Sequence, residues 1–185
     1  MDAIEAIKTR RSIRLFKKKD VSPGKIVKVL ECGVKAPSAS NYQPWEFVIV
    51  RQGSVKNRIG YLGARSLFER KKRKLKDAKK QFSKIAEAPV FIVVACDTKA
   101  SPIFWKQDGS AATQNMLLAA HAQGLGGVWL GAPVALSKHK NEIKKLIGIP
   151  RHYDIISIVA LGYPAKKPRA RPMMDFKSKV HFERW

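Results

Sequence analysis

Three arginines and one serine lie within five residues near the N-terminus, in the segment Arg10-Arg11-Ser12-Ile13-Arg14. A guanidinium group can donate two parallel hydrogen bonds to a phosphate or to a planar acceptor edge. The segment would therefore suit a ligand that carries both a phosphate and a planar polar ring. Taken alone, however, a basic run of this kind is more often a solvated turn.

A second polar stretch runs from Pro37 to Pro44, with the sequence Pro-Ser-Ala-Ser-Asn-Tyr-Gln-Pro. Serine, asparagine and glutamine side chains in such a loop hydrogen-bond either to the local backbone or to a ligand. Asn41 and Gln43 could simply cap a turn, but with Trp45 directly after the loop we favour a ligand-binding role.

Hydrophobic spacing predicts the elements that position these residues. Asp2 and Glu5 have the spacing of a capping box, which favours a short helix over residues 3–10 and an extended chain after it. Further helices are expected over 23–35, from residue 53, over 108–122 and from Ser137. Continuous apolar runs predict strands, one of them buried at 47–50, one central at 90–96, and others at 126–131 and 155–161. This alternation is typical of an α+β or three-layer α/β domain.

Two predicted helices stand out. The helix over 108–122 is apolar on nearly every side, which indicates burial inside the domain or in a subunit interface. Asp108 is interpreted as a cap at its start and His121 as a core or interface histidine. The segment 65–84 carries ten cations and two acids, and we expect a single helix that docks by a thin apolar stripe. A solvated face is its default interpretation, with an anion-binding or lid role as the alternative.

The composition predicts one domain over residues 1–185, because the chain is 45% hydrophobic and long enough to bury a core. Neither a membrane span nor a signal peptide is indicated, so we expect a cytoplasmic protein. Cys32 and Cys96 are predicted to be buried free thiols. The net charge of +23 would attract nucleic acid, anionic membranes or phosphorylated ligands.

Several kinds of site are not supported. His139, His152 and His181 lack acidic or cysteine partners at metal-ligand spacing, so no metal site is expected. Local sequence suggests no Ser-His-Asp or Cys-His arrangement. The glycines at 124–127 follow a helix and precede a strand, which is the reverse of a dinucleotide-binding fingerprint.

Four motifs together resemble those of the nitroreductase-like FMN-dependent oxidoreductase family. They occur in order over essentially the whole chain: Arg10–Arg14, Pro37-Ser38-x-x-Asn41-x-Gln43-Pro44-Trp45, Gly124-Leu125-Gly126 and Gly162-Tyr163-Pro164. The resemblance implies a homodimer with FMN at the interface and NADH or NADPH as electron donor. It also implies a three-layer fold whose four-stranded, mainly antiparallel sheet is extended by the partner's C-terminal tail, here about residues 165–185.

The resemblance further implies which residues bind the flavin. Arg10 would meet the phosphate, Ser12 the ribityl chain or ring edge, and Arg14 the N1/C2-carbonyl end, where a fixed cation raises the flavin potential. The 37–43 loop would come from the partner subunit, and the backbone at Leu130 and Gly131 would lie near N5. The implied cofactor-binding residues are Arg10, Arg11, Ser12, Arg14, Pro37, Ser38, Ala39, Asn41, Gln43, Leu130, Gly131, Arg169 and Arg171.

The proline-spaced tail departs from the family pattern, which has a basic residue there to complete the phosphate site. Pro172 is followed by Met173 and Met174, so Arg169 or Arg171 would have to substitute.

The activity implied is a ping-pong transfer of electrons from NAD(P)H to a small acceptor such as a nitroaromatic, a quinone or an enone. No catalytic side chain is assigned, because the flavin carries the chemistry. One alternative is an electrostatic nucleic-acid-binding protein on the same fold, although sequence-specific binding is not expected. Another is a family member that modifies its flavin or dehalogenates a substrate.

Overall fold

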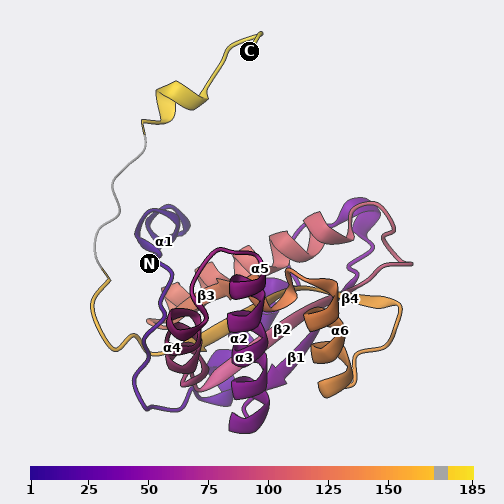
Figure 1. Ribbon diagram of the computed structural model, residues 1–185. Helices are drawn as coiled ribbons and strands as arrows, with labels where there is room; N and C mark the ends of the chain where they lie inside the picture. The colour runs from indigo at the N-terminus through magenta and orange to yellow at the C-terminus, as the bar shows by residue number, and fades with distance from the viewer. Residues whose placement is uncertain (169–174) are drawn as a thin grey trace.

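The computed structural model describes residues 1–168 and 175–185 and has three layers, with helices on both faces of one sheet (Figure 1). The four strands lie in the order β1-β2-β4-β3, and every neighbouring pair is antiparallel. They are β1 (Trp45–Val50), β2 (Val90–Asp97), β3 (Gly126–Leu130) and β4 (Tyr153–Gly162). The predicted fold class and the four strands are therefore confirmed.

One strand is less buried than its sequence indicates. The apolar run at 47–50 was expected to be a buried strand, but β1 lies at an edge of the sheet and Ile49 is 41% exposed. The prediction was wrong because an apolar run does not reveal whether a strand has neighbours on both sides. β2 is internal and buried, as expected.

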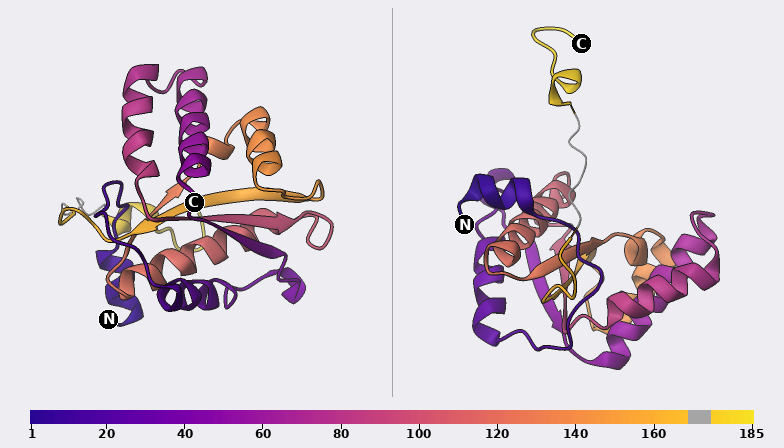
Figure 2. Two further views of the ribbon diagram at one scale, coloured as in Figure 1. Left: turned by 90° about the horizontal axis from the view of Figure 1, so that it is seen from below. Right: turned by 90° about the vertical axis from the view of Figure 1, so that its left-hand side faces the viewer.

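Two groups of helices cover the sheet (Figure 2). α2 (Pro23–Gly33) and α5 (Trp105–Ala122) cover one face, where Val29, Met116 and Ile92 share one core cluster. α3 (Gly53–Glu69), α4 (Leu75–Ala86) and α6 (Ser137–Leu146) cover the other, around Phe91 and Ile158. Strand residues alternate between the two clusters because successive side chains point to opposite faces.

The basic segment 65–84 comprises the end of α3, the turn of a helical hairpin and most of α4, so the prediction of one helix was wrong. Lys71 has a φ of +52°, in the left-handed region. The N–H of Lys71 donates to the carbonyl of Phe68, and that of Lys72 donates to the carbonyl of Leu67. This is the Schellman pattern that ends a helix, and it most often has glycine at the left-handed position. A lysine there removed the usual sequence signal.

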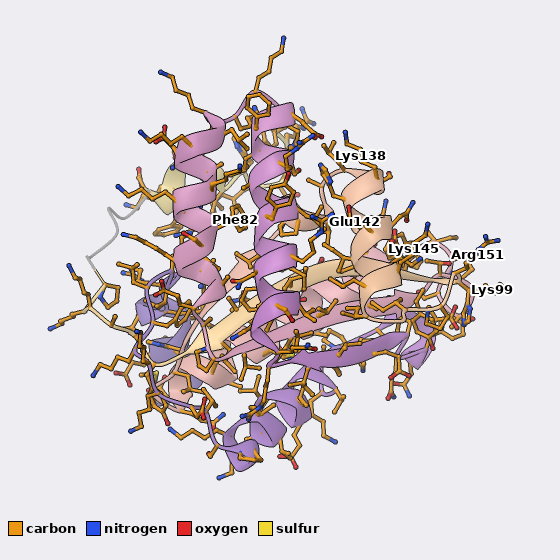
Figure 3. All side chains as sticks on the ribbon, turned by 60° about the horizontal axis from the view of Figure 1, so that its bottom comes forward. Phe82, Lys99, Lys138, Glu142, Lys145 and Arg151 are labelled. Atoms are coloured by element: carbon orange, nitrogen blue, oxygen red, sulfur yellow. The ribbon has the colours of Figure 1, made fainter. Side chains whose placement is uncertain are left out.

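Close packing and ion pairs hold the hairpin. Figure 3 shows Phe82 of α4 between the two helices and Glu142 of α6 on the side of α3. A Cβ at Gly63 would lie 2.5 Å from the Phe82 ring, so only glycine permits this approach. Glu142 in turn accepts hydrogen bonds from the guanidinium of Arg58 on α3.

A second polar link joins the end of α3 to the start of α6. Glu69 accepts hydrogen bonds from Arg65, Lys138 and the buried His139. The hydrogen bond from Lys138 is the largest of several effects that lower the pKa of Glu69 to about 2. The carboxylate therefore stays ionised at neutral pH and fixes the position of α6.

The last described residues leave their aromatic side chains uncovered. Residues 175–185 contain the short helix η3 (Phe176–Lys179), and Phe182 is 87% exposed. Trp185 is exposed and stacks on His181. Residues 175–185 lie away from the body of their own chain (Figures 1 and 2).

Among the described residues, no helix combines the length and apolarity needed to cross a membrane. Cys96 is buried, but Cys32 is exposed near the end of α2, so its predicted burial was wrong. Apolar residues near a position in the sequence are not enough to place its side chain on the inner face of a helix.

Candidate functional site

The arginine segment is held against one end of the sheet by backbone pairing. The short helix α1 (Ala3–Thr9) begins with Asp2, whose carboxylate accepts a hydrogen bond from the N–H of Glu5, as the capping pattern predicts. After α1, Ser12 pairs in parallel with Gly127, and the N–H of Ile13 donates to the Gly127 carbonyl at 3.1 Å. The chain is therefore extended where Ser12 and Arg14 occur, as expected.

Gly126 allows this close approach. A Cβ at Gly126 would lie 2.5 Å from Cγ1 and 2.8 Å from Cβ of Ile13. Ile13 is buried over this glycine, while its neighbours Ser12 and Arg14 are exposed. The alternation presents the hydroxyl and the guanidinium on the outer side of the segment.

The polar side chains of the segment differ in what they contact. Within the described residues, the side chains of Ser12 and Arg14 make no hydrogen bond or ion pair. The guanidinium of Arg11 instead donates to the carbonyls of Lys8 and Arg10, and its Nε is buried without a described partner. Arg11 thus closes the end of α1, while Arg14 remains available to a ligand.

His121 of α5 supports the same helix end. The hydroxyl of Thr9 donates to the carbonyl of Glu5, so it can only accept at 2.8 Å from Nε2 of His121. Burial, followed by the charge of Arg10, lowers the pKa of His121. This agrees with the expected role as a satisfied histidine and indicates the Nε2–H tautomer.

The loop over 37–43 has an unusual backbone. Ser40, Asn41 and Gln43 have φ angles of +48°, +56° and +49°, in the left-handed region. Each such residue costs on the order of 1 kcal/mol and persists only where its surroundings fix it. The loop includes the 3-10 turn η1 (Ala39–Asn41).

Hydrogen bonds inside the loop account for part of this order. The hydroxyl of Ser38 accepts from the N–H of Gln43, and the Gln43 amide donates to the Asn41 side chain at 2.8 Å. Asn41 and Gln43 therefore support one another, and both side chains are exposed to a ligand.

Asp108 ties the loop to the body, and its interpretation as a helix cap was wrong. It lies in the first turn of α5 but is only 4% exposed, and the N-cap position belongs to Phe104. One carboxylate oxygen accepts from the N–H of Ala39 at 3.0 Å, and the other accepts from the hydroxyl of Ser101 at 2.8 Å. The partner is 69 residues distant, so spacing along the sequence could not reveal it. The signal that was available is that Asp108 is the single acid of the predicted helix.

A cavity of about 320 Å³ lies beside this contact. The loop residues Pro37, Ser38 and Ala39 line it, together with Phe104, which caps α5, and the α5 residues Gln107, Asp108 and Ala111. The loop therefore borders an open space large enough for part of a small ligand.

The arginine segment and the 37–43 loop lie at opposite ends of the sheet, and they are called the two polar groups below. Ser12 of the arginine segment pairs with Gly127 near the start of β3, and Phe16, two residues after the segment, pairs with Pro164 just past the end of β4. The 37–43 loop leads into Trp45, which pairs with Cys96 near the start of β4. At about 3.3 Å per residue, the length of β4 separates them by about 30 Å. The left view of Figure 2 shows α1 and the turn before β1 on opposite sides of the molecule.

The end of β3 lies between these groups. Leu130 is buried, and Gly131 is exposed with no atom within 4 Å of the position that a Cβ would take. The packing of this chain therefore does not require glycine at 131. The 3-10 turn η2 (Ala132–Val134) follows and packs on α3. Arg169 and Arg171, proposed to complete a phosphate site, and Met173 lie outside the described residues.

Comparison with known proteins identifies relatives over the whole chain. The nitroreductase family model matches residues 7–163. A Methanothermobacter thermautotrophicus protein described as an NADH dehydrogenase/NAD(P)H nitroreductase is 38% identical over 187 residues, covering 100% of this chain and 88% of its own length.

Solved structures extend the comparison. A structure with the same description from Parabacteroides distasonis has a TM-score of 0.81 and 31% identity, with 98% of each chain covered. An FMN-dependent nitroreductase from Clostridium difficile has a TM-score of 0.80 and 26% identity, with 98% of this chain and 99% of its own chain covered.

Proposed function

Because the chain belongs to the nitroreductase family, we propose that it is an FMN-dependent oxidoreductase that works as a homodimer. In this proposal residues 1–185 form a single domain, and the protein is located in the cytoplasm. NADH or NADPH donates the electrons, and a small nitroaromatic, quinone or enone accepts them.

The separation of the two polar groups within one chain is the observation that carries the proposal. An FMN molecule cannot bridge about 30 Å, whereas the end of one subunit can meet the opposite end of another. The exposed aromatic side chains of the tail support the same arrangement, because a second subunit would cover them. The tail would then extend the sheet of the partner.

The residues present fit FMN. Arg14 and Ser12 offer a guanidinium and a hydroxyl with no partner in the described part of the chain, and the Nε of Arg11 is buried without one. Open space at Gly131 leaves room for a flat ring against the backbone. When bound, FMN would supply the two-electron chemistry, as flavins do.

The chain's own residues would bind and orient the flavin. Arg10 binds the phosphate, Ser12 hydrogen-bonds the ribityl chain or ring edge, and Arg14 places a positive charge at the N1 end of the ring. Asn41 and Gln43 of the partner subunit complete the polar edge. The two substrates would bind in turn over the same ring face. No side chain is assigned as an acid or base, because the flavin would carry the electron transfer and solvent can supply the protons.

The visible spectrum of the purified protein tests the proposal. We expect flavin bands near one FMN per chain, loss of those bands on anaerobic addition of NADH or NADPH, and their return when a quinone or nitroaromatic is added. Arg14→Ala should weaken FMN retention and lower the flavin potential. A colourless protein that also fails to bind added FMN would refute the proposal, and release of halide from a halogenated phenol would identify a dehalogenating member instead.

A further inference from the structure

A buried carboxylate needs a compensating partner, and Asp108 has two. It is 4% exposed, and its oxygens accept hydrogen bonds from a backbone N–H of the 37–43 loop and from the buried hydroxyl of Ser101. A buried acid is costly, and no cation pairs with Asp108 among the described residues, so its presence in the core calls for an explanation.

The start of α5 is pressed against the sheet, which fixes the position of Asp108. A Cβ at the next residue, Gly109, would lie 2.7 Å from the Cys96 sulfur and 2.6 Å from Ile156. Burial, followed by the charge of Asp108, raises the pKa of Cys96 to about 12. The carboxylate is thus held by a rigid part of the core rather than by a mobile helix end.

The loop itself lacks any comparable anchor. In the described part of the chain, the bond from Ala39 to Asp108 is the one hydrogen bond that joins residues 38–43 to another element, because the others lie within the loop. Three of the next four residues, Ser40, Asn41 and Gln43, are in the left-handed region. Without an external tie, a backbone of this kind relaxes to less strained conformations.

From these observations we propose that Asp108 is a positioning residue for the flavin site. It holds the 37–43 loop in the conformation that presents Asn41 and Gln43, and it does so for the flavin that is bound by the arginines of the partner subunit. This inference rests on the proposed function. Asp108 itself touches neither flavin nor substrate.

Two substitutions at this position separate the hydrogen bond from the negative charge. Asp108→Ala removes the acceptor, and FMN should bind about tenfold more weakly, which corresponds to about 1.4 kcal/mol. Asp108→Asn keeps an acceptor for the Ala39 N–H and donates to Ser101 instead, so affinity should return to within about threefold of the original. Thr113→Val is the matched control, because Thr113 is a buried polar residue of α5 that contacts Ser157 and not the loop.

FMN titration of the apoprotein is the first measurement, with the midpoint potential of the bound flavin as the second. A loss of affinity in Asp108→Ala, recovered in Asp108→Asn and absent in Thr113→Val, supports the inference. Equal affinity in Asp108→Ala and the unmodified protein overturns it, while failure of the unmodified protein to bind FMN refutes the proposed function instead. If Asp108→Ala does not fold, Ser101→Ala frees one carboxylate oxygen and should weaken binding by about twofold to threefold, and unchanged binding there counts against the inference.

A mixed dimer tests whether the effect crosses the interface. One subunit carries Asp108→Ala and the other carries Arg10→Ala. In the crossed arrangement both changes fall on the same flavin site, so one site per dimer keeps the original affinity. Two weakened sites would overturn the proposal that Asp108 acts on the partner's flavin.

Discussion

Replacing Gly126 by alanine should displace the arginine segment from the sheet. The new Cβ would lie 2.5 Å from Cγ1 and 2.8 Å from Cβ of Ile13. A rotation of the Ile13 side chain cannot relieve the second contact, because Cβ moves only with the backbone. Reaching an ordinary separation of 3.4 Å requires a backbone shift of about 0.6 Å. The same shift would lengthen the 3.1 Å bond between Ile13 and Gly127 beyond hydrogen-bonding distance.

The expected cost combines two effects. Overpacking in a well-packed site costs about 1–3 kcal/mol, and a lost hydrogen bond costs about 1 kcal/mol. Gly126→Ala should therefore lower the free energy of unfolding by about 2–4 kcal/mol. FMN should also bind more weakly, since Ser12 and Arg14 move with the segment.

Denaturant unfolding at a fixed protein concentration, followed by FMN titration, measures both effects. Gly24→Ala is the control, because a Cβ there would meet no atom within 4 Å. The double variant Gly126→Ala with Ile13→Ala should be more stable than the two separate losses predict, as most of the crowding atoms are gone. If Gly126→Ala matches Gly24→Ala in stability and FMN affinity, the close approach of Ile13 does not position the segment.

Three other sites lead to further predictions. Gly131→Ala should leave the stability of the apoprotein unchanged but weaken FMN binding. Calorimetry of the apoprotein and of the FMN-bound protein measures both quantities, and unchanged FMN binding would show that Gly131 does not lie against the flavin. Glu69→Gln should destabilise the protein above the ordinary pKa of 4.5, and the difference from the unmodified protein should shrink as pH falls toward about 2, because Lys138 and other donors hold the folded-state pKa low. Denaturant unfolding across that range checks it, and a difference independent of pH would contradict it. Reversing the three cations at 71–73 to glutamate should raise the KM for NAD(P)H at low salt and not at high salt, since the charges act through solvent. If the variant and the unmodified protein have equal KM values at low salt, the hairpin has no electrostatic role in binding NAD(P)H.

The sequence predicted the parts of the fold that depend on neighbouring residues. Continuous apolar runs located β2 and β4, and the Asp2 cap predicted α1, because these signals act over a few residues. The helical hairpin was missed because a lysine occupies the left-handed position that glycine usually marks. The position of β1 at the sheet edge depends on the order of strands, which no single run of residues contains.

The candidate site also combines features that are local in the sequence with contacts that exist only in the folded chain. The types and spacing of residues 10–14 and 37–43 were sufficient to indicate a ligand, because both stretches are local in the chain. Asp108 was interpreted as a cap because its contact with Ala39 exists only in the folded chain. Its place as the single acid of the predicted helix was visible in the sequence, and such an acid warrants a search for a distant backbone donor.

The placement of the two polar groups at opposite ends of β4 also has a consequence for cofactor retention. If a complete site needs both ends, a lone subunit has only two half-sites, and binding of FMN is thermodynamically linked to association. Dilution would then release the cofactor even when its affinity for the assembled protein is high, and added FMN would in turn hold subunits together. The fraction of flavin sites that hold FMN would therefore rise with the protein concentration.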